Sequence, residues 1–158
     1  MESGSVTHDT FVIERTYPVS ADRVFAAFSD EAKKRRWYAE SNSHDVEEFS
    51  QDFRIGGAER LHYRFKEGTP FKGVVVLNEG VFQNIVPNQC IVTSSNMSLG
   101  GKYISASLVT IEFLTVKDGT NLVVTHQGAF FEGADGPEMR QAGWRVLLER
   151  LANRDWDD

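Results

Sequence analysis

The residues at positions 58–66 alternate cleanly between apolar side chains and basic or polar ones. In an extended segment, Leu61, Tyr63 and Phe65 would fall on one face. The opposite face would carry Arg60, His62, Arg64 and Lys66. Successive side chains of a β-strand point to opposite faces of its sheet. The pattern therefore predicts a half-buried antiparallel strand whose apolar face is the inner one.

Other segments rich in β-branched and aromatic residues predict further strands. These expected strands span residues 10–17, 44–53, 74–86, 89–97, 103–116 and 121–131. The turn-forming segments that separate them are Arg54–Gly57, Glu67–Pro70, Pro87–Asn88, Gly100–Gly101 and Asp118–Gly119. The spacing of these turns predicts a meander, in which each strand pairs with its neighbour in the chain.

Two short helices are expected after the first strand. Ser20 suits the N-cap of a helix over residues 21–28, and a second short helix is expected to end near Trp37. The four basic residues at 33–36 are typical of a solvated helix end rather than of an anion site.

The chain is predicted to close with a long helix from about Asp135 to Asn153. Asp135 and Glu138 have the spacing of a capping box. The apolar stripe at helical spacing consists of Trp144, Leu147, Leu148 and Leu151. One face of this helix is therefore expected to be buried against the sheet.

This order of elements predicts an α+β fold with a curved antiparallel sheet of about six to seven strands around the long C-terminal helix. A strongly twisted sheet of this size must curl around the helix, which leaves a space between them. One domain is expected over residues 10–154, with polar termini at 1–9 and 155–158.

Composition narrows the classes of partner. The 158 residues carry a formal net charge of −6, which argues weakly against nucleic acid. Cys90 is the single cysteine, so no intrachain disulfide is expected, and a reducing compartment, the cytoplasm, is the simplest assignment. No apolar run approaches the roughly 18 residues of a membrane span, and the first residues lack the pattern of a signal peptide.

Several motifs occur in one order along the chain. They are Arg15–Phe25, the turn Phe53–Gly57, Glu79–Pro87, Ile104–Phe113, Gly119–Leu122, His126–Gly128, Gly143–Trp144 and Leu147–Leu148. Together they resemble the START-like (SRPBCC) superfamily, whose fold is the helix grip. The similar branch is that of the 90-kDa heat-shock-protein ATPase activator. The resemblance implies an internal cavity for a hydrophobic molecule or lipid, or a stress-related co-chaperone role.

The candidate cavity residues follow from strand faces, helix faces and the resemblance. They are Trp37, Tyr38, Phe53, Leu61, Tyr63, Phe65, His126, Phe130, Met139 and Gly143. Trp37 and Tyr38 follow the second helix and can reach the open end of a cavity. Met139 and Gly143 are four residues apart and share a helix face, where glycine leaves space and methionine adapts to varied shapes. A close helix–sheet contact explains Gly143 about as well.

His126 has two interpretations. On the inner face it would orient a ligand or act as an acid or base. Alternatively, it forms a hydrogen bond across the strands or faces solvent. A cyclase- or hydrolase-like enzyme would need polar cavity residues, for which Arg15, Tyr63, Glu112 and His126 are the candidates. The sequence assigns no catalytic residue, metal or cofactor.

Three functions remain open. The leading hypothesis is a binding module for a small hydrophobic or amphipathic molecule, acting as a monomer or homodimer without nucleic acid or membrane. The second is an enzyme that uses the polar cavity residues. The third is a chaperone partner that stimulates a heat-shock ATPase through an exposed surface.

Overall fold

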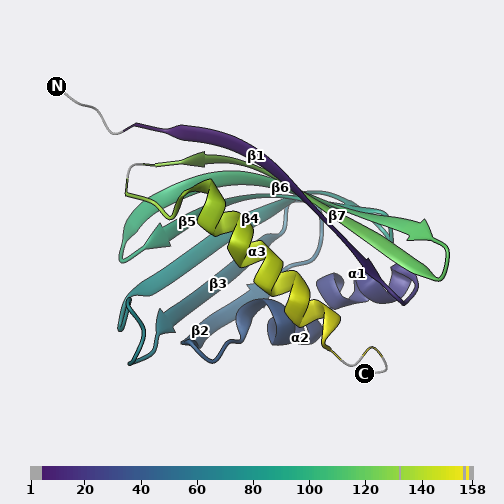
Figure 1. Cartoon of the computed structure of the whole chain (residues 1–158), viewed down its shortest axis with the longest axis horizontal. Helices are drawn as coiled ribbons and strands as arrows, with labels where there is room; N and C mark the ends of the chain where they lie inside the picture. Colours follow the sequence, from purple (N-terminus) through teal and green to yellow (C-terminus); the bar gives the residue numbers. More distant parts are fainter. Residues whose placement is uncertain (1–4, 132, 155, 157–158) are drawn as a thin grey trace.

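Seven strands form one antiparallel sheet in the computed structural model, which describes residues 5–131, 133–154 and 156. The strands are β1 (Thr7–Tyr17), β2 (His44–Gln51), β3 (Ala58–Phe65), β4 (Val75–Val86), β5 (Cys90–Leu99), β6 (Lys102–Val116) and β7 (Gly119–Phe130). The helices are α1 (Ala21–Ser29), α2 (Glu31–Lys34), the π-helix η1 (Arg35–Ala39) and α3 (Gly136–Ala152). This arrangement confirms the predicted α+β fold (Figure 1).

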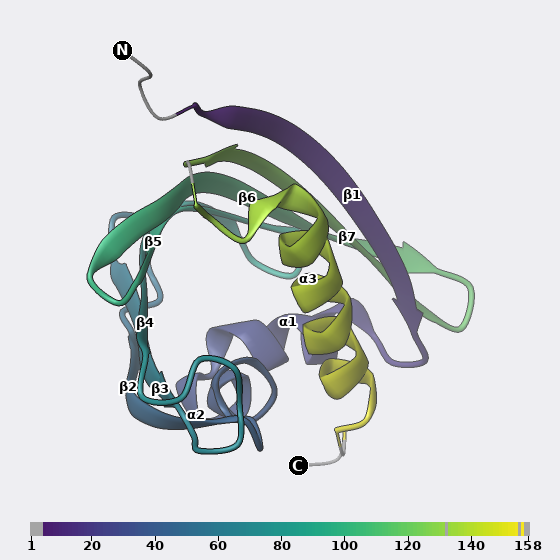
Figure 2. The same ribbon diagram turned by 60° about the vertical axis from the view of Figure 1, so that its left-hand side comes forward.

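The spatial order of the strands is β1-β7-β6-β5-β4-β3-β2. From β2 to β7 each strand pairs with its neighbour in the chain, as expected for a meander, and β1 pairs with β7 along its whole length. The sheet curls, so that β3, β4 and β5 face α3 across the molecule (Figure 2). Helices α1 and α2 lie at one end of the curled sheet.

The main apolar core lies at the end of the molecule that carries α1. Its largest fully buried side chains include Tyr17, Phe28, Phe82, Leu122, Leu148 and Leu151. The Tyr17 hydroxyl donates a hydrogen bond of 2.9 Å to the carbonyl of Leu148, which ties β1 to α3. Trp37 lies in the same core and donates to the carbonyl of Ala27 at 2.9 Å. The C-terminal half of α3 is thus fixed by the core.

The long helix begins and ends within a residue of the predicted limits, but its predicted capping box is wrong. Asp135 has a helical backbone and caps no backbone N–H. Its carboxylate instead accepts two hydrogen bonds from the Arg140 guanidinium, at 2.8 and 2.9 Å. A bidentate guanidinium–carboxylate pair makes two parallel charge-assisted bonds, which add geometric specificity as well as energy.

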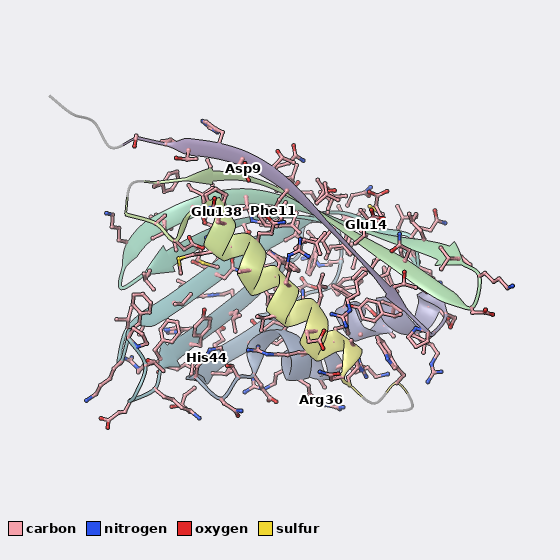
Figure 3. All side chains as sticks on the ribbon, viewed as in Figure 1. Asp9, Phe11, Glu14, Arg36, His44 and Glu138 are labelled. Carbon is pink, nitrogen blue, oxygen red and sulfur yellow. The ribbon has the colours of Figure 1, made fainter. Side chains whose placement is uncertain are left out.

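The basic run at 33–36 is not wholly solvated, which corrects the expectation for Lys34. Lys34 is buried, and its ammonium donates to Glu59 of β3 at 2.6 Å. Arg36 is exposed and lies at the outer edge of the molecule (Figure 3). The sequence alone does not predict which residue of the basic run is buried, because α2 passes into the π-helix η1, whose turn is wider than that of an α-helix.

The N-terminal boundary also differs from the expectation. Residues 7–9 pair with residues 128–130 of β7, although they were expected in a polar terminus. Residues 1–4, 155, 157 and 158 of the expected termini lie outside the described residues. None of the described helices is long and apolar enough to cross a membrane.

Candidate functional site

A pocket of about 390 Å³ lies between the N-terminal half of α3 and the inner faces of β3, β5 and β6. A volume of this size is within the range of small-molecule sites. Its apolar lining consists of Leu61, Tyr63, Phe65, Met97, Val109, Ile111, Met139, Trp144, Val146 and Leu147. The pocket opens at one side, where the exposed side chains of Met139 and Val146 form part of the rim.

Small side chains on the concave side of the sheet keep this space open. Gly80 of β4 and Thr93 and Ser95 of β5 line the pocket where the sheet curls. Neighbouring strands bring larger side chains, Leu61 of β3 and Val109 of β6, to its sides. The pocket therefore arises because the centre of the sheet lacks bulky residues opposite α3.

The structure brings most of the predicted cavity residues together. Tyr38, Leu61, Tyr63, Phe65, His126, Met139 and Gly143 line the pocket. The other predicted residues, Trp37, Phe53 and Phe130, lie outside its lining. Trp37 is a core residue, and Phe53 packs edge-on against Phe82 at 5.0 Å between ring centroids.

Trp37 and Tyr38 are adjacent in η1, and they point in different directions. Trp37 packs on Phe28 in the core, whereas Tyr38 lines the pocket. The side-chain amide of Asn78 donates to the Tyr38 hydroxyl at 3.1 Å. Burial raises the pKa of Tyr38 well above its ordinary value, so the phenol stays neutral. Tyr38 therefore offers the pocket a neutral hydroxyl.

His126 of β7 faces the pocket and is only 1% exposed. Its ring stacks on Phe11, at 4.6 Å between centroids, and on Phe130, at 5.9 Å. Burial, assisted by the Arg140 guanidinium, lowers the pKa of His126 to about 4, so the imidazole is neutral at pH 7. Its Nδ1 atom has no hydrogen-bond partner among the described residues.

Two ion pairs form part of the pocket wall. Lys34 and Glu59 make one of them, and the Lys34 ammonium also lies 4.5 Å from the centre of the Tyr38 ring. Asp135 and Arg140 make the other, and Arg140 also donates to the Ser105 hydroxyl at 2.9 Å. The sequence analysis did not predict these two ion pairs, although the alternation of residues 58–66 places Glu59 on the same face as Leu61.

Polar groups surround the rim near β2. Arg150 donates to the Glu40 carbonyl at 3.2 Å and to the Ser41 hydroxyl at 3.3 Å. His44, at the β2 end of the sheet (Figure 3), bonds through Nε2 to the Ala39 carbonyl at 2.6 Å. Its ring stacks on Tyr63 at 3.9 Å, and burial lowers its pKa. The part of the rim near β2 is therefore polar.

The polar residues named as enzyme candidates do not gather at one place. His126 and Tyr63 line the pocket, whereas Glu112 lies outside its lining and Arg15 pairs with Glu149 at the surface. No cluster of three or more potential metal ligands occurs among the residues that the structure describes. The arrangement can bind and orient a molecule, and its carboxylates are already occupied by cations.

Comparison with known proteins identifies the family. The model of the family described as "Activator of Hsp90 ATPase homolog 1-like protein" matches residues 18–154. The chain belongs to this family. The Mll3558 protein from Rhizobium loti has a similar structure, with 49% sequence identity over 94% of this chain and 97% of that one, and a TM-score of 0.83. No curated protein matches the sequence.

Two further solved structures of similar fold are informative. An uncharacterized protein from Rhizobium leguminosarum shares 33% identity over 96% of both chains, with a TM-score of 0.88. The AHSA1-like protein from Aeromonas hydrophila shares 20% identity over 91% of this chain and 90% of that one, with a TM-score of 0.66. At this identity the similarity shows the fold alone. The predicted membership of the START-like superfamily and its helix-grip fold are confirmed.

Proposed function

We propose that this protein binds a small hydrophobic or amphipathic molecule, such as a lipid, in the pocket between α3 and the sheet. The observation that carries the proposal is the open pocket of about 390 Å³ with a mostly apolar lining. Burying an apolar ligand there would remove its surface from water, which contributes about 25 cal/mol per Å² before the costs of association.

Binding is favoured over catalysis by how the polar lining groups are used. Glu59 and Asp135 each accept hydrogen bonds from a cation, and His44 bonds to a backbone carbonyl. His126 faces the pocket, and no carboxylate among the described residues forms a hydrogen bond with it that would orient it as a base. The described residues thus contain no oriented acid–base pair in the pocket.

The family description also names an ATPase activator, which suggests a second role. Activation of a heat-shock ATPase would use an exposed surface of this protein rather than its pocket. A substitution that fills the pocket should then leave binding to the ATPase unchanged. The two roles are therefore separable by one variant.

Gly143→Leu is that variant, because Gly143 lines the pocket and a Cβ atom there would meet no other atom within 4 Å. Leucine also has a higher helix propensity than glycine, so α3 should be at least as stable. Ala142→Leu is the matched control, since Ala142 is exposed on the same helix outside the lining.

The measurement is the affinity for the uncharged dye Nile red, followed by its fluorescence. We expect saturable binding to the unchanged protein and to Ala142→Leu. Gly143→Leu should bind the dye at least about tenfold more weakly while its circular dichroism spectrum stays the same. Equal affinities of the three proteins, or no saturable binding, would overturn the proposal.

A further inference from the structure

The charges that line the pocket interior compensate one another. Lys34 pairs with Glu59, and each side chain is only 10% exposed. Arg140, also 10% exposed, makes a bidentate pair with Asp135. An ionic group on a ligand would lose its hydration inside the pocket without gaining an unpaired partner of opposite charge. The interior therefore favours an uncharged ligand.

One polar group of the interior is left without a partner. His126 is almost wholly buried, faces the pocket, and has an Nδ1 atom that bonds to nothing among the described residues. Leaving a buried polar atom unpaired is destabilising, and such atoms are rare in folded proteins. A group on the ligand that bonds to the imidazole would remove this cost.

The ring is held in place for such a contact. Phe11 stacks on it nearly parallel, at 5° between the ring planes, and the Phe130 ring stacks on it at 23°. Arg140 lies over the Phe130 ring, 5.1 Å from its centre. The imidazole is thus positioned by packing against its aromatic neighbours.

A neutral imidazole has one N–H donor and one bare nitrogen acceptor. Of the uncharged groups common in hydrophobic molecules, a hydroxyl can both donate and accept, so it matches either tautomer. We infer that the pocket is specific for an uncharged hydrophobic molecule that carries a hydroxyl group, and that this hydroxyl forms a hydrogen bond with His126. The inference rests on the proposed function.

The rim offers a competing mode of binding, which the test must separate. Arg150 lines the pocket near its opening. Its guanidinium donates hydrogen bonds to two neutral oxygen atoms, the carbonyl of Glu40 and the hydroxyl of Ser41. A fatty acid with its carboxylate at Arg150 would have its apolar end in the interior. Recognition would then depend on Arg150 and not on His126.

The experiment is the displacement of Nile red at pH 7 by decanol and by decanoate, which differ in the end group. We expect decanol to displace the dye from the unchanged protein at a concentration at least about tenfold lower than decanoate, because a carboxylate is costly to bury. In His126→Phe, which keeps an aromatic ring against Phe11 and Phe130, the decanol affinity relative to Nile red should fall about threefold to tenfold.

The matched control is His62→Phe on the outer face of β3, where the ratio of decanol to Nile red affinity should not change. An unchanged ratio in His126→Phe, or a decanoate affinity that equals that of decanol and falls in Arg150→Met, would overturn this inference and leave the proposed function standing. Failure of Nile red to bind the unchanged protein would overturn both.

Discussion

The ammonium of Lys34 and the carboxylate of Glu59 form a buried ion pair beneath Tyr38. Removing one partner leaves the other charge buried alone, so Lys34→Met should lower the free energy of unfolding by about 3–5 kcal/mol. The double variant Lys34→Met, Glu59→Leu should lose less, because neither charge remains. Urea denaturation measures both changes. A loss below about 1 kcal/mol in the single variant would mean that the pair is solvated.

The depressed pKa of His126 makes the stability of the fold depend on pH. Its value falls from 6.5 to about 4 on folding, so between these pH values the unfolded chain binds a proton that the folded chain does not. This contribution is fully present above pH 6.5 and is lost as the pH falls toward 4. At pH 5 the loss should reach about 2 kcal/mol relative to pH 7.5.

His126→Phe provides the comparison for this pH dependence, because it retains the shifted His44 and all the carboxylates. Denaturant titrations at pH 7.5 and pH 5 should show a smaller loss of unfolding free energy in the variant than in the unchanged protein, by about 2 kcal/mol. Equal losses would show that the imidazole is as accessible to protons in the folded state as in the unfolded one.

At the scale of residues, the sequence predicts a side chain's face better than its partners. The alternation of residues 58–66 correctly placed Tyr63 on the inner face, where it lines the pocket. It could not place Lys34 opposite Glu59, because that contact joins segments 25 residues apart and depends on the turn of η1. It also could not decide between the two interpretations of His126, which needs the orientation of β7 relative to β1.

At the scale of elements, α3 has two parts that differ in burial. Leu148 and Leu151 are buried in the main core, whereas Met139, Gly143 and Val146 border the pocket. The apolar stripe predicted the first part, because core contacts follow helical periodicity. In the second part, the four-residue spacing of Met139 and Gly143 predicted a shared pocket face, and both line the pocket. Val146 was not predicted, because periodicity does not distinguish an exposed rim position from a solvated one.

Leu148→Ala tests the buried part of α3. Leu148 is 1% exposed and packs in the core beside Tyr17, so its truncation should lower the free energy of unfolding by about 2–5 kcal/mol. Val146→Ala on the exposed part should change it by no more than about 0.5 kcal/mol. Thermal and urea denaturation of both variants measure these changes. Similar small effects at both positions would show that the core face of α3 is misassigned.

At the scale of the molecule, the pocket depends on how far the sheet curls. The sequence predicted a curved sheet around a final helix and a space between them, because a long twisted sheet cannot lie flat on one helix. It did not identify the small residues Gly80, Thr93 and Ser95 that keep the space open. Their importance appears only once β4 and β5 are known to lie opposite α3.

We propose that a hydrophobic molecule binds between α3 and the concave face of the sheet. The most direct test is the set of intermolecular nuclear Overhauser effects between bound Nile red and the methyl groups of the protein. We expect contacts to Leu61, Ile111 and Leu147, which line the pocket. Contacts to the exposed side chains of Val12 and Leu114 instead would contradict it.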